Sequence, residues 1–237
     1  EALLFKEMSM KHYKKVLTIA GSDSGGGAGI QADIKTMSAC GCYAMSAITA
    51  ITAQNTVGVS GIHNVPADMV AAQIAAVLED IGVDAVKLGM LPTEASVVAI
   101  AGLLKKYEVT NVVLDPVMVS TSGSRLIDEP AAEAIRTHLF PLATVVTPNI
   151  PETEYLTGLK IGSEADFAGA AVAMSQQRVR AVLFKAGHLD GEILTDYLFD
   201  NEKLIRHYRY DRINTLNTHG TGCSLSSAIA SYLALEY

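Results

Sequence analysis

Short, almost entirely apolar segments alternate with helix-like segments along most of this chain, and this order constrains the fold more than any other feature. Val16–Ala20 and Val112–Leu114 are typical of the apolar segments, and each is followed by a break. Strands that are apolar throughout and separated by helices are characteristic of a parallel sheet with both faces covered. The chain has no internal repeat and no low-complexity linker. We therefore predict a single α/β domain with three layers and a mostly parallel central sheet.

The apolar periodicity and the turn residues predict the elements in more detail. We expect strands at 16–20, 43–52, 85–90, 112–114, 144–146 and 181–184, and a strand pair at 194–198 and 204–210. Helices are expected at about 30–39, 66–81, 93–104 and 130–139, from Asn149 onward and from Cys223 onward. Residues 1–15 are expected to form an N-terminal extension outside the domain, which then spans 16–237.

The composition restricts the classes of partner. Of the 237 residues, 49% are hydrophobic, which is typical of a globular protein with a large core. The net charge of −7 is spread without a Lys/Arg block, which argues against nucleic acid or a membrane as the main partner. The three cysteines lack metal-type spacing and no signal peptide is evident, so we expect reduced thiols and a cytoplasmic location.

Polar side chains with chemical potential follow the predicted strands. Open α/β sheets bind ligands in a crevice along the carboxyl ends of their strands. The residues at or just past these ends are Asp23, Gln54, Met90, Asp115, Asn149 and Lys185. The sequence therefore predicts one binding edge before any family is considered.

The glycine-rich segment Gly21–Gly29 follows the first predicted strand and precedes a helix. It lacks the Gly-Lys-Ser/Thr ending of a Walker loop, and Ile30 stands where a dinucleotide-binding fingerprint needs its last glycine. The segment is either a flexible connector or a loop whose backbone approaches a small molecule closely. Its position between strand and helix favours the binding loop.

The segment Asn217–Cys223 places two glycines before a helix of small and apolar residues. Glycines there let successive N–H groups point one way, and the helix dipole reinforces them, so this segment predicts an anion site. The same field would favour the thiolate form of Cys223. The alternative is that Cys223 is a small buried apolar side chain at a helix start.

Four further residues carry both a structural and a chemical interpretation. Asn149 and Glu152 could simply cap a helix, or they could face a magnesium–nucleotide complex. Lys185 and Asp115 could end their strands, or they could supply a cation for phosphates and an acid for a metal. Taken together with the anion site, they are the parts that phosphoryl transfer requires.

These motifs resemble the hydroxymethylpyrimidine/phosphomethylpyrimidine kinases of thiamine biosynthesis, a family of ribokinase-like kinases. The resemblance runs in order from about Val16 to the last residue. It is carried by Gly21–Asp33, Ala50–Thr56, Lys87–Met90, Asp115–Val117, Thr147–Glu152, Lys185–His188 and Asn217–Cys223.

The resemblance implies a three-layer ribokinase-like fold and an enzyme that uses ATP and Mg²⁺. Such an enzyme phosphorylates 4-amino-5-hydroxymethyl-2-methylpyrimidine and then its monophosphate. Gln54 matches the residue that hydrogen-bonds the pyrimidine. The rest of the implied substrate pocket is Gly21, Asp23, Ala28, Met90 and Val117.

The resemblance also assigns the nucleotide side and the catalytic set. The implied nucleotide-binding residues are Asn149, Glu152, Lys185, Thr221 and Asp115, with Glu152 and Asp115 as the metal ligands. The implied catalytic residues are Cys223, Gly220, Thr221, Gly222 and Lys185. Gly220–Cys223 match an anion hole, and Cys223 stands where sugar kinases of this fold place an aspartate base.

Three other functions stay open. One is a pyridoxal kinase of the same cysteine-bearing kind, one is a non-catalytic sensor of a vitamin precursor, and one is a cysteine hydrolase that uses Cys223 with His219. The phosphate-directed set argues against a pure sensor. We expect small-molecule partners only and a homodimer. Since relatives continue beyond the position of Tyr237, we expect the domain to be C-terminally incomplete.

Overall fold

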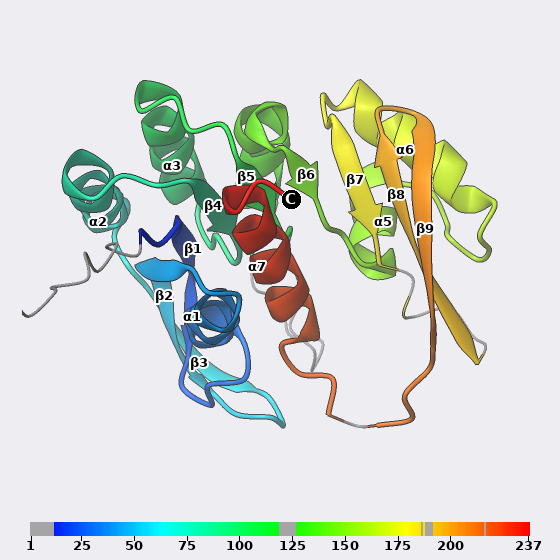
Figure 1. Ribbon diagram of the computed structural model, residues 1–237, viewed down its shortest axis with the longest axis horizontal. Helices are drawn as coiled ribbons and strands as arrows, with labels where there is room; N and C mark the ends of the chain where they lie inside the picture. Colours follow the sequence, from blue (N-terminus) through cyan, green and yellow to red (C-terminus); the bar gives the residue numbers. More distant parts are fainter. Residues whose placement is uncertain (1–11, 119–126, 186, 188–191, 216) are drawn as a thin grey trace, which may run out of the picture.

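The computed structural model describes residues 12–118, 127–185, 187, 192–215 and 217–237 (Figure 1). These residues form a nine-stranded sheet in the order β3-β2-β1-β4-β5-β6-β7-β8-β9. The strands are β1 Lys15–Asp23, β2 Tyr43–Gln54, β3 Val59–Asn64, β4 Ala85–Leu88, β5 Val112–Leu114, β6 Val145–Val146, β7 Ala181–Phe184, β8 Ile193–Asp200 and β9 Lys203–Asp211. Strands β2, β1, β4, β5, β6 and β7 run parallel, whereas β3, β8 and β9 pair antiparallel with their neighbours.

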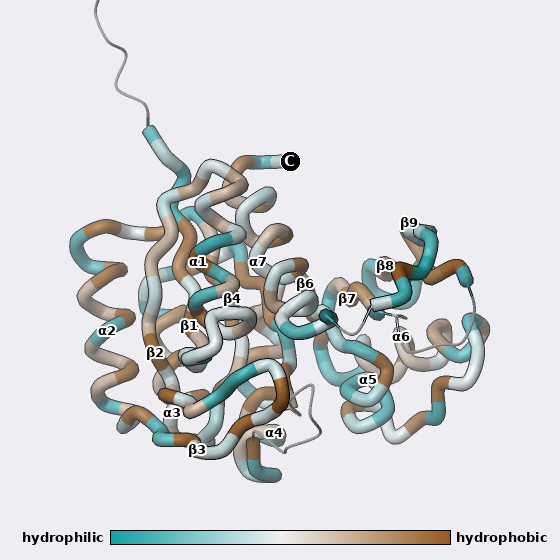
Figure 2. Tube along the Cα trace, turned by 90° about the horizontal axis from the view of Figure 1, so that it is seen from below, coloured by the Kyte–Doolittle hydropathy of each residue, from teal (hydrophilic) through white to brown (hydrophobic). Residues whose placement is uncertain are grey.

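Helices cover both faces of the parallel part of the sheet. They are α1 Gly29–Ala39, α2 Ala67–Asp80, α3 Glu94–Lys106, α4 Glu129–Ala134, α5 Ile150–Thr157, α6 Asp166–Gln176 and α7 Thr221–Ala234. Figure 2 shows α1 and α7 on one side of β1 and β4, with α3 and α4 on the other. The three-layer arrangement predicted from the sequence is confirmed.

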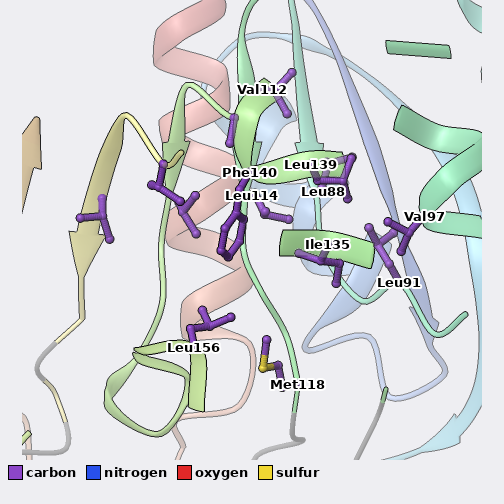
Figure 3. Close-up of a cluster of buried hydrophobic side chains, with 14 of the residues drawn as sticks. Leu88, Leu91, Val97, Val112, Leu114, Met118, Ile135, Leu139, Phe140 and Leu156 are labelled. Atoms are coloured by element: carbon purple, nitrogen blue, oxygen red, sulfur yellow. The ribbon is translucent and has the colours of Figure 1, made fainter. Parts of the chain in front are cut away.

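The strands carry apolar side chains on both faces because successive residues point to opposite sides. In β5, Val112 and Leu114 join the larger core under α2 to α6, and Val113 joins the smaller core under α1 and α7. Figure 3 shows the larger core, where Phe140 lies beside Leu114. Both faces of the short central strands are thereby removed from water. This burial stabilises the strands, which carry the loops at their carboxyl ends.

The predicted elements are largely confirmed, with differences in extent. Strands β1 and β2 run to Asp23 and Gln54, three and two residues beyond their predicted ends. The strand expected at 85–90 ends at Leu88. The helix expected at 130–139 is an α-helix over Glu129–Ala134, followed by a π-helical turn Ile135–Leu139 and a 3₁₀ turn Phe140–Leu142. Pro141 lies within the 3₁₀ turn and has no N–H, so it cannot continue the hydrogen-bond pattern of the preceding π-helical turn.

Two elements were absent from the sequence prediction. Strand β3 pairs with β2 at the sheet edge and is mostly exposed, so it lacks the apolar pattern of the inner strands. Helix α6, which is rich in alanine, is the other. Of the predicted extension, residues 1–11 lie outside the described residues, and β1 begins at Lys15. Within the described ranges, no helix has the length and apolarity that a bilayer crossing requires.

Candidate active site

The residues expected at the binding edge do lie at one end of the sheet. Asp23 and Gln54 are the last residues of β1 and β2, and Asp115 directly follows β5. Lys185 directly follows β7, and its N–H donates to the Pro148 carbonyl at 2.9 Å. Because these strands are parallel, their carboxyl ends meet at the same edge.

The two glycine-containing loops pack backbone against backbone at this edge. Gly220 adopts φ +80°, and a Cβ there would lie 1.7 Å from the Gly27 carbonyl oxygen. Gly29 adopts φ +56°, and a Cβ there would lie 2.3 Å from the Gly21 carbonyl oxygen. No other residue fits either position without moving the neighbouring backbone. The glycines therefore bring the loop after β1 against the loop before α7.

Asp23 organises both loops. Its carboxylate accepts hydrogen bonds from the N–H groups of Gly25, Gly27 and Ala28 at 2.7, 3.1 and 2.8 Å. His219 Nε2 lies 2.9 Å from the same carboxylate. Burial would raise the pKa of Asp23, but the hydrogen bonds from His219 and the loop amides outweigh it and lower the pKa. The sequence placed Asp23 in the substrate pocket, and in the structure its side chain also joins the two loops.

The remaining pocket residues surround the first of these loops. The Met90 methyl group would lie 3.1 Å from a Cβ on Gly21, so Met90 lines this loop. The Gln54 side-chain oxygen accepts from Thr52 Oγ1 at 3.0 Å. Ser24 Oγ donates to the Gln54 carbonyl at 2.7 Å, which ties the loop to the end of β2. Ala28 is the N-cap of α1. The structure thus brings these predicted residues together around one loop.

Val117 belongs to the other side of the site. Its N–H donates to the Asp115 carbonyl oxygen at 2.8 Å, in a tight turn just past β5. The sequence grouped Val117 with the pyrimidine pocket, and the structure places it in the segment that also carries Asp115. In the motif Lys185–His188, Ala186 and His188 lie outside the described residues.

Lys185 and Asp115 form a buried ion pair beside α7. Lys185 Nζ lies 2.8 Å from Asp115 Oδ1, and Thr147 Oγ1 donates to the same oxygen at 3.1 Å. Burial opposes both charges, yet their attraction prevails: the pKa of Asp115 is lowered and the pKa of Lys185 is raised. A Cβ on Gly222 would lie 3.1 Å from Lys185 Nζ. The lysine charge therefore sits against the first turn of α7.

Asn149 and Glu152 form a capping box at the start of α5. The Glu152 N–H donates to Asn149 Oδ1 at 2.9 Å, and the Asn149 N–H donates to Glu152 Oε2 at 2.8 Å. This confirms the capping interpretation of the pair. Burial and the nearby Asp115 raise the pKa of Glu152 to about 7, although Lys185 opposes the rise. Glu152 is thus a buried acid next to a second carboxylate.

The carboxylates of Glu152 and Asp115 are suited to a divalent cation whose remaining ligands are water and phosphate oxygens. Among the described residues, no group of three or more metal-ligating side chains occurs. When both are ionised, Glu152 and Asp115 carry two negative charges against the single positive charge of Lys185, and Asp115 adds to the rise in the pKa of Glu152 that burial mainly causes. Mg²⁺ is commonly held by one or two carboxylates together with water and phosphate oxygens, and this donor set fits that pattern.

The prediction that the start of α7 favours the thiolate form of Cys223 is wrong. The sequence led us to expect that the helix start would favour its thiolate. In the structure burial has the largest effect and raises the pKa of the thiol, with Asp115 and Asp33 adding to the rise. Lys87 acts in the opposite direction, as does a hydrogen bond from the Gly29 backbone. The position of Cys223 in the first turn of α7 agrees with the prediction, since the helix begins at Thr221.

Several residues of the site were not singled out by the sequence analysis. Ser226 Oγ donates to Asp115 Oδ2 at 3.3 Å, and Ser227 Oγ donates to Asp33 at 2.7 Å. Lys87, which we noted only within a motif, forms a second buried pair with Asp33. The interruption of an apolar strand by a lysine was the only signal for this pair in the sequence.

A cation, backbone donors, a helix N-terminus and two buried carboxylates therefore meet at the carboxyl edge of a mostly parallel sheet. This combination of groups is the one that a phosphoryl-transfer enzyme with an α/β fold requires. The family model for phosphomethylpyrimidine kinase matches residues 23–237. The chain belongs to the phosphomethylpyrimidine kinase family, and the resemblance inferred from its motifs is confirmed.

Curated relatives support this membership. The chain is 52% identical over 219 residues to the hydroxymethylpyrimidine/phosphomethylpyrimidine kinase of Rhizobium meliloti, covering 92% of this chain and 82% of that protein. It is also 52% identical over 233 residues to a thiamine biosynthesis bifunctional protein of Geobacter sulfurreducens. That match covers 98% of this chain, but the chain spans only 47% of the bifunctional protein.

Solved structures share the fold. The phosphomethylpyrimidine kinase of Clostridium difficile superposes with a TM-score of 0.82 and 47% identity, covering 94% of this chain and 92% of the other. A pyridoxal kinase of Bacillus subtilis, solved as an ADP complex, superposes with a TM-score of 0.87 and 38% identity, covering 95% and 86%. The ribokinase-like fold expected from the resemblance is confirmed.

The close approach at Gly220 predicts a specific loss of stability. Replacing Gly220 by Ala places a methyl group against the Gly27 carbonyl and forces a left-handed backbone on a non-glycine residue. We expect Gly220→Ala to lower the free energy of unfolding by about 1–3 kcal/mol in urea titrations. Gly158 is the matched control, because it has φ +72° with nothing within 4 Å of the Cβ position. Equal losses in the two variants would contradict the close approach.

The raised pKa of Glu152 predicts a pH-dependent effect on stability. Its folded pKa of about 7 exceeds the ordinary 4.5, so the folded protein binds the extra proton. The associated stabilisation is present below about pH 4.5 and is lost as the pH rises through about 7. We expect Glu152→Gln, which keeps a capping oxygen, to gain stability relative to the parent between about pH 5 and pH 8.

Glu154→Gln is the control for this experiment. Glu154 lies on the same helix, but its hydrogen bond from Lys160 lowers its pKa. Its contribution is therefore constant above the ordinary carboxyl range, and the stability difference from the parent should stay flat over the same pH window. Urea titrations at several pH values give both curves. A flat difference for Glu152→Gln would mean that Glu152 ionises normally.

Proposed function

We propose that this chain transfers the γ-phosphoryl group of ATP to the hydroxymethyl group of 4-amino-5-hydroxymethyl-2-methylpyrimidine and then to the resulting monophosphate. The product would be the pyrimidine diphosphate for thiamine synthesis. The observation that carries this proposal is the Lys185–Asp115 pair, 2.8 Å apart, against the first turn of α7. The names of the relatives, which include hydroxymethylpyrimidine/phosphomethylpyrimidine kinase and a thiamine biosynthesis protein, support the choice of substrate.

The phosphate side of the proposed reaction uses the start of α7. The first N–H groups of a helix have no partner within the helix, and the helix dipole makes this end attractive to anions. Gly220 packs against the Gly27 backbone, and Gly222 lets the first turn lie close to Lys185 Nζ. We assign the transferred phosphoryl group to Gly220–Cys223, with Thr221 in the same turn and Lys185 beside it. Lys185 would neutralise the charge that spreads over the phosphoryl oxygens during transfer.

The metal side uses the two carboxylates. Glu152 and Asp115 are the residues that would hold Mg²⁺, together with phosphate oxygens and water, near the cap at Asn149. A divalent cation held by Glu152 and Asp115 would supply positive charge that reduces the repulsion between the phosphates and the attacking hydroxyl. The residues of the chain keep this region ordered, since Asn149 and Glu152 cap α5 and Asp115 is held by Thr147 and Ser226.

The proton of the substrate hydroxyl is assigned to Cys223. As the hydroxyl oxygen bonds to the γ-phosphorus, its proton passes to the Cys223 thiolate. The bond between the γ-phosphorus and the bridging oxygen breaks at the same stage, and ADP leaves with that electron pair. The thiol then returns its proton to solvent.

In this proposal the pyrimidine ring lies against the segment Gly21–Ala28, and the amide of Gln54 forms hydrogen bonds with the edge of the ring.

Pyridoxal kinase activity is the competing function, because the Bacillus subtilis pyridoxal kinase shares the fold at a TM-score of 0.87. Its sequence identity of 38% is below the 52% of the Rhizobium meliloti pyrimidine kinase. Incubation with magnesium-ATP and each heterocycle, followed by mass analysis of the products, separates the two. Phosphorylation of pyridoxal alone would overturn the proposal. The expected homodimer and cytoplasmic location stay predictions.

Removing the Lys185 charge should impair transfer rather than pyrimidine binding. We expect Lys185→Met to lower kcat by about 100-fold or more, as loss of one transition-state donor typically does, with little change in pyrimidine affinity. Lys160→Met is the control, since Lys160 pairs with Glu154 on an exposed surface. Steady-state rates at saturating ATP measure both. A Lys185→Met enzyme with the parental kcat would remove Lys185 from the proposed mechanism.

Removing the Gln54 amide should affect only the pyrimidine. We expect Gln54→Ala to weaken pyrimidine binding by about 1–3 kcal/mol, the cost of losing a buried hydrogen bond, while ATP affinity is unchanged. Gln73→Ala serves as the control, because the Gln73 amide contacts β2 through the backbone of Ile48 instead. Calorimetric titration with each ligand measures the affinities. Unchanged pyrimidine affinity in Gln54→Ala would disprove the assignment.

A further inference from the structure

His219 lies in the segment before α7, and its ring reaches the end of β1. His219 Nε2 is 2.9 Å from Asp23 Oδ2. The Asp23 side chain is 2% exposed and the His219 side chain 15%, so water has little access to this contact. The Asp23 carboxylate already accepts three backbone N–H groups, so it acts as an acceptor here as well, and His219 Nε2 is the donor.

The imidazole ring of His219 also covers the backbone of Gly27. A Cβ on Gly27 would lie 2.6 Å from His219 Cδ2, and the three heavy atoms nearest to that position all belong to the ring. Gly220, the next residue, packs against the carbonyl of the same glycine. A methyl group at position 27 would therefore displace the ring from Asp23.

The turn that contains His219 leads directly into α7. The Thr218 carbonyl accepts hydrogen bonds from the Thr221 N–H at 3.3 Å and from Thr221 Oγ1 at 3.0 Å. These bonds close a turn around His219 and Gly220. The Gly220 carbonyl in turn accepts a hydrogen bond from the Ser224 N–H at 2.9 Å. A shift of His219 would therefore move the start of α7.

The contact joins the two segments to which the proposed function assigns the reacting groups. Among the described residues, it is the one hydrogen bond between a side chain of Gly21–Ala28 and a side chain of Asn217–Cys223. In the proposed function the first segment holds the pyrimidine and the second holds the phosphoryl group. Reaction requires the attacking and attacked atoms to be aligned and about 3–3.5 Å apart. The relative position of the two segments would therefore set the rate.

We propose that His219 is a positioning residue whose hydrogen bond to Asp23 holds the start of α7 at the distance from the segment Gly21–Ala28 that phosphoryl transfer requires. This inference rests on the proposed function, because it concerns the same site. It assigns to His219 no proton transfer and no contact with substrate. The packing of Gly220 against Gly27 does not involve the ring, so loss of the hydrogen bond should shift the two segments without unfolding the protein.

Replacing His219 tests the contact by kinetics. We expect His219→Ala to lower kcat about 100-fold, the effect of a misplacement of about 1 Å, while the affinities for the pyrimidine and for an ATP analogue change less than about threefold. His219→Gln keeps a side-chain N–H donor and should recover most of the rate. His207→Ala, which changes an exposed histidine of β9, is the control and should keep the parental kcat. Steady-state rates and calorimetric titrations measure these quantities.

Gly27→Ala tests the same contact from the other side. Its methyl group would push the ring away from Asp23, so we expect a similar loss of kcat. In the His219→Ala background the ring is absent, and the same substitution should cause little further loss. Additive losses in the double variant would overturn the proposal. A parental kcat in His219→Ala would do so too, as would a His219→Gln enzyme that is as slow as His219→Ala.

Hydrogen exchange separates this proposal from the proposed function, because it needs no substrate. Amide exchange followed by mass spectrometry should be faster in His219→Ala than in the parent, both in Gly25–Ala28 and in the first turn of α7, and should return to the parental rate in His219→Gln. Parental exchange in His219→Ala would also overturn the proposal. A parent protein that does not phosphorylate the pyrimidine would instead refute the proposed function and leave the exchange measurement valid.

Discussion

Helix α7 is attached to the end of β5 and to α1 through two buried carboxylates, Asp115 and Asp33, and the site depends on this attachment. Ser226 donates to Asp115 and Ser227 donates to Asp33. Each carboxylate is in turn neutralised by a lysine, so neither is left as an uncompensated buried charge. Moving α7 would break both sets of hydrogen bonds at once. The first turn of the helix, which the proposed function assigns to the phosphoryl group, is therefore held rigidly before any ligand arrives.

The two lysine–aspartate pairs differ in exposure, and this difference separates their roles. Lys185 retains 15% exposure at the binding edge, whereas Lys87 has none. A partly exposed cation can exchange its carboxylate partner for a phosphate, while a sealed one can only act through its field. The fold thus places one partly exposed and one sealed lysine–aspartate pair against α7.

Much of the fold and part of the site could be predicted from the sequence. Buried parallel strands are recognisable because both faces must be apolar, and their polar ends mark the binding edge. Edge strand β3 gave no such signal, because it is exposed and buries little of its surface in a core. The capping interpretation of Asn149 and Glu152, one of two that the sequence left open, is confirmed, since capping depends on residues only three positions apart.

The sequence by itself determined the order of strands and helices, the glycines at tight positions and the family. The tertiary structure decided the electrostatics. Helix position alone predicted a lowered pKa for Cys223, and the structure reversed that direction because burial and the charges of Asp115 and Asp33 act on the sulfur through space. The pairing of Lys87 with Asp33 spans 54 positions of chain. The pKa shift and the ion pair both depend on the distances between groups in space and on their exposure to water. Neither quantity can be read from the local sequence.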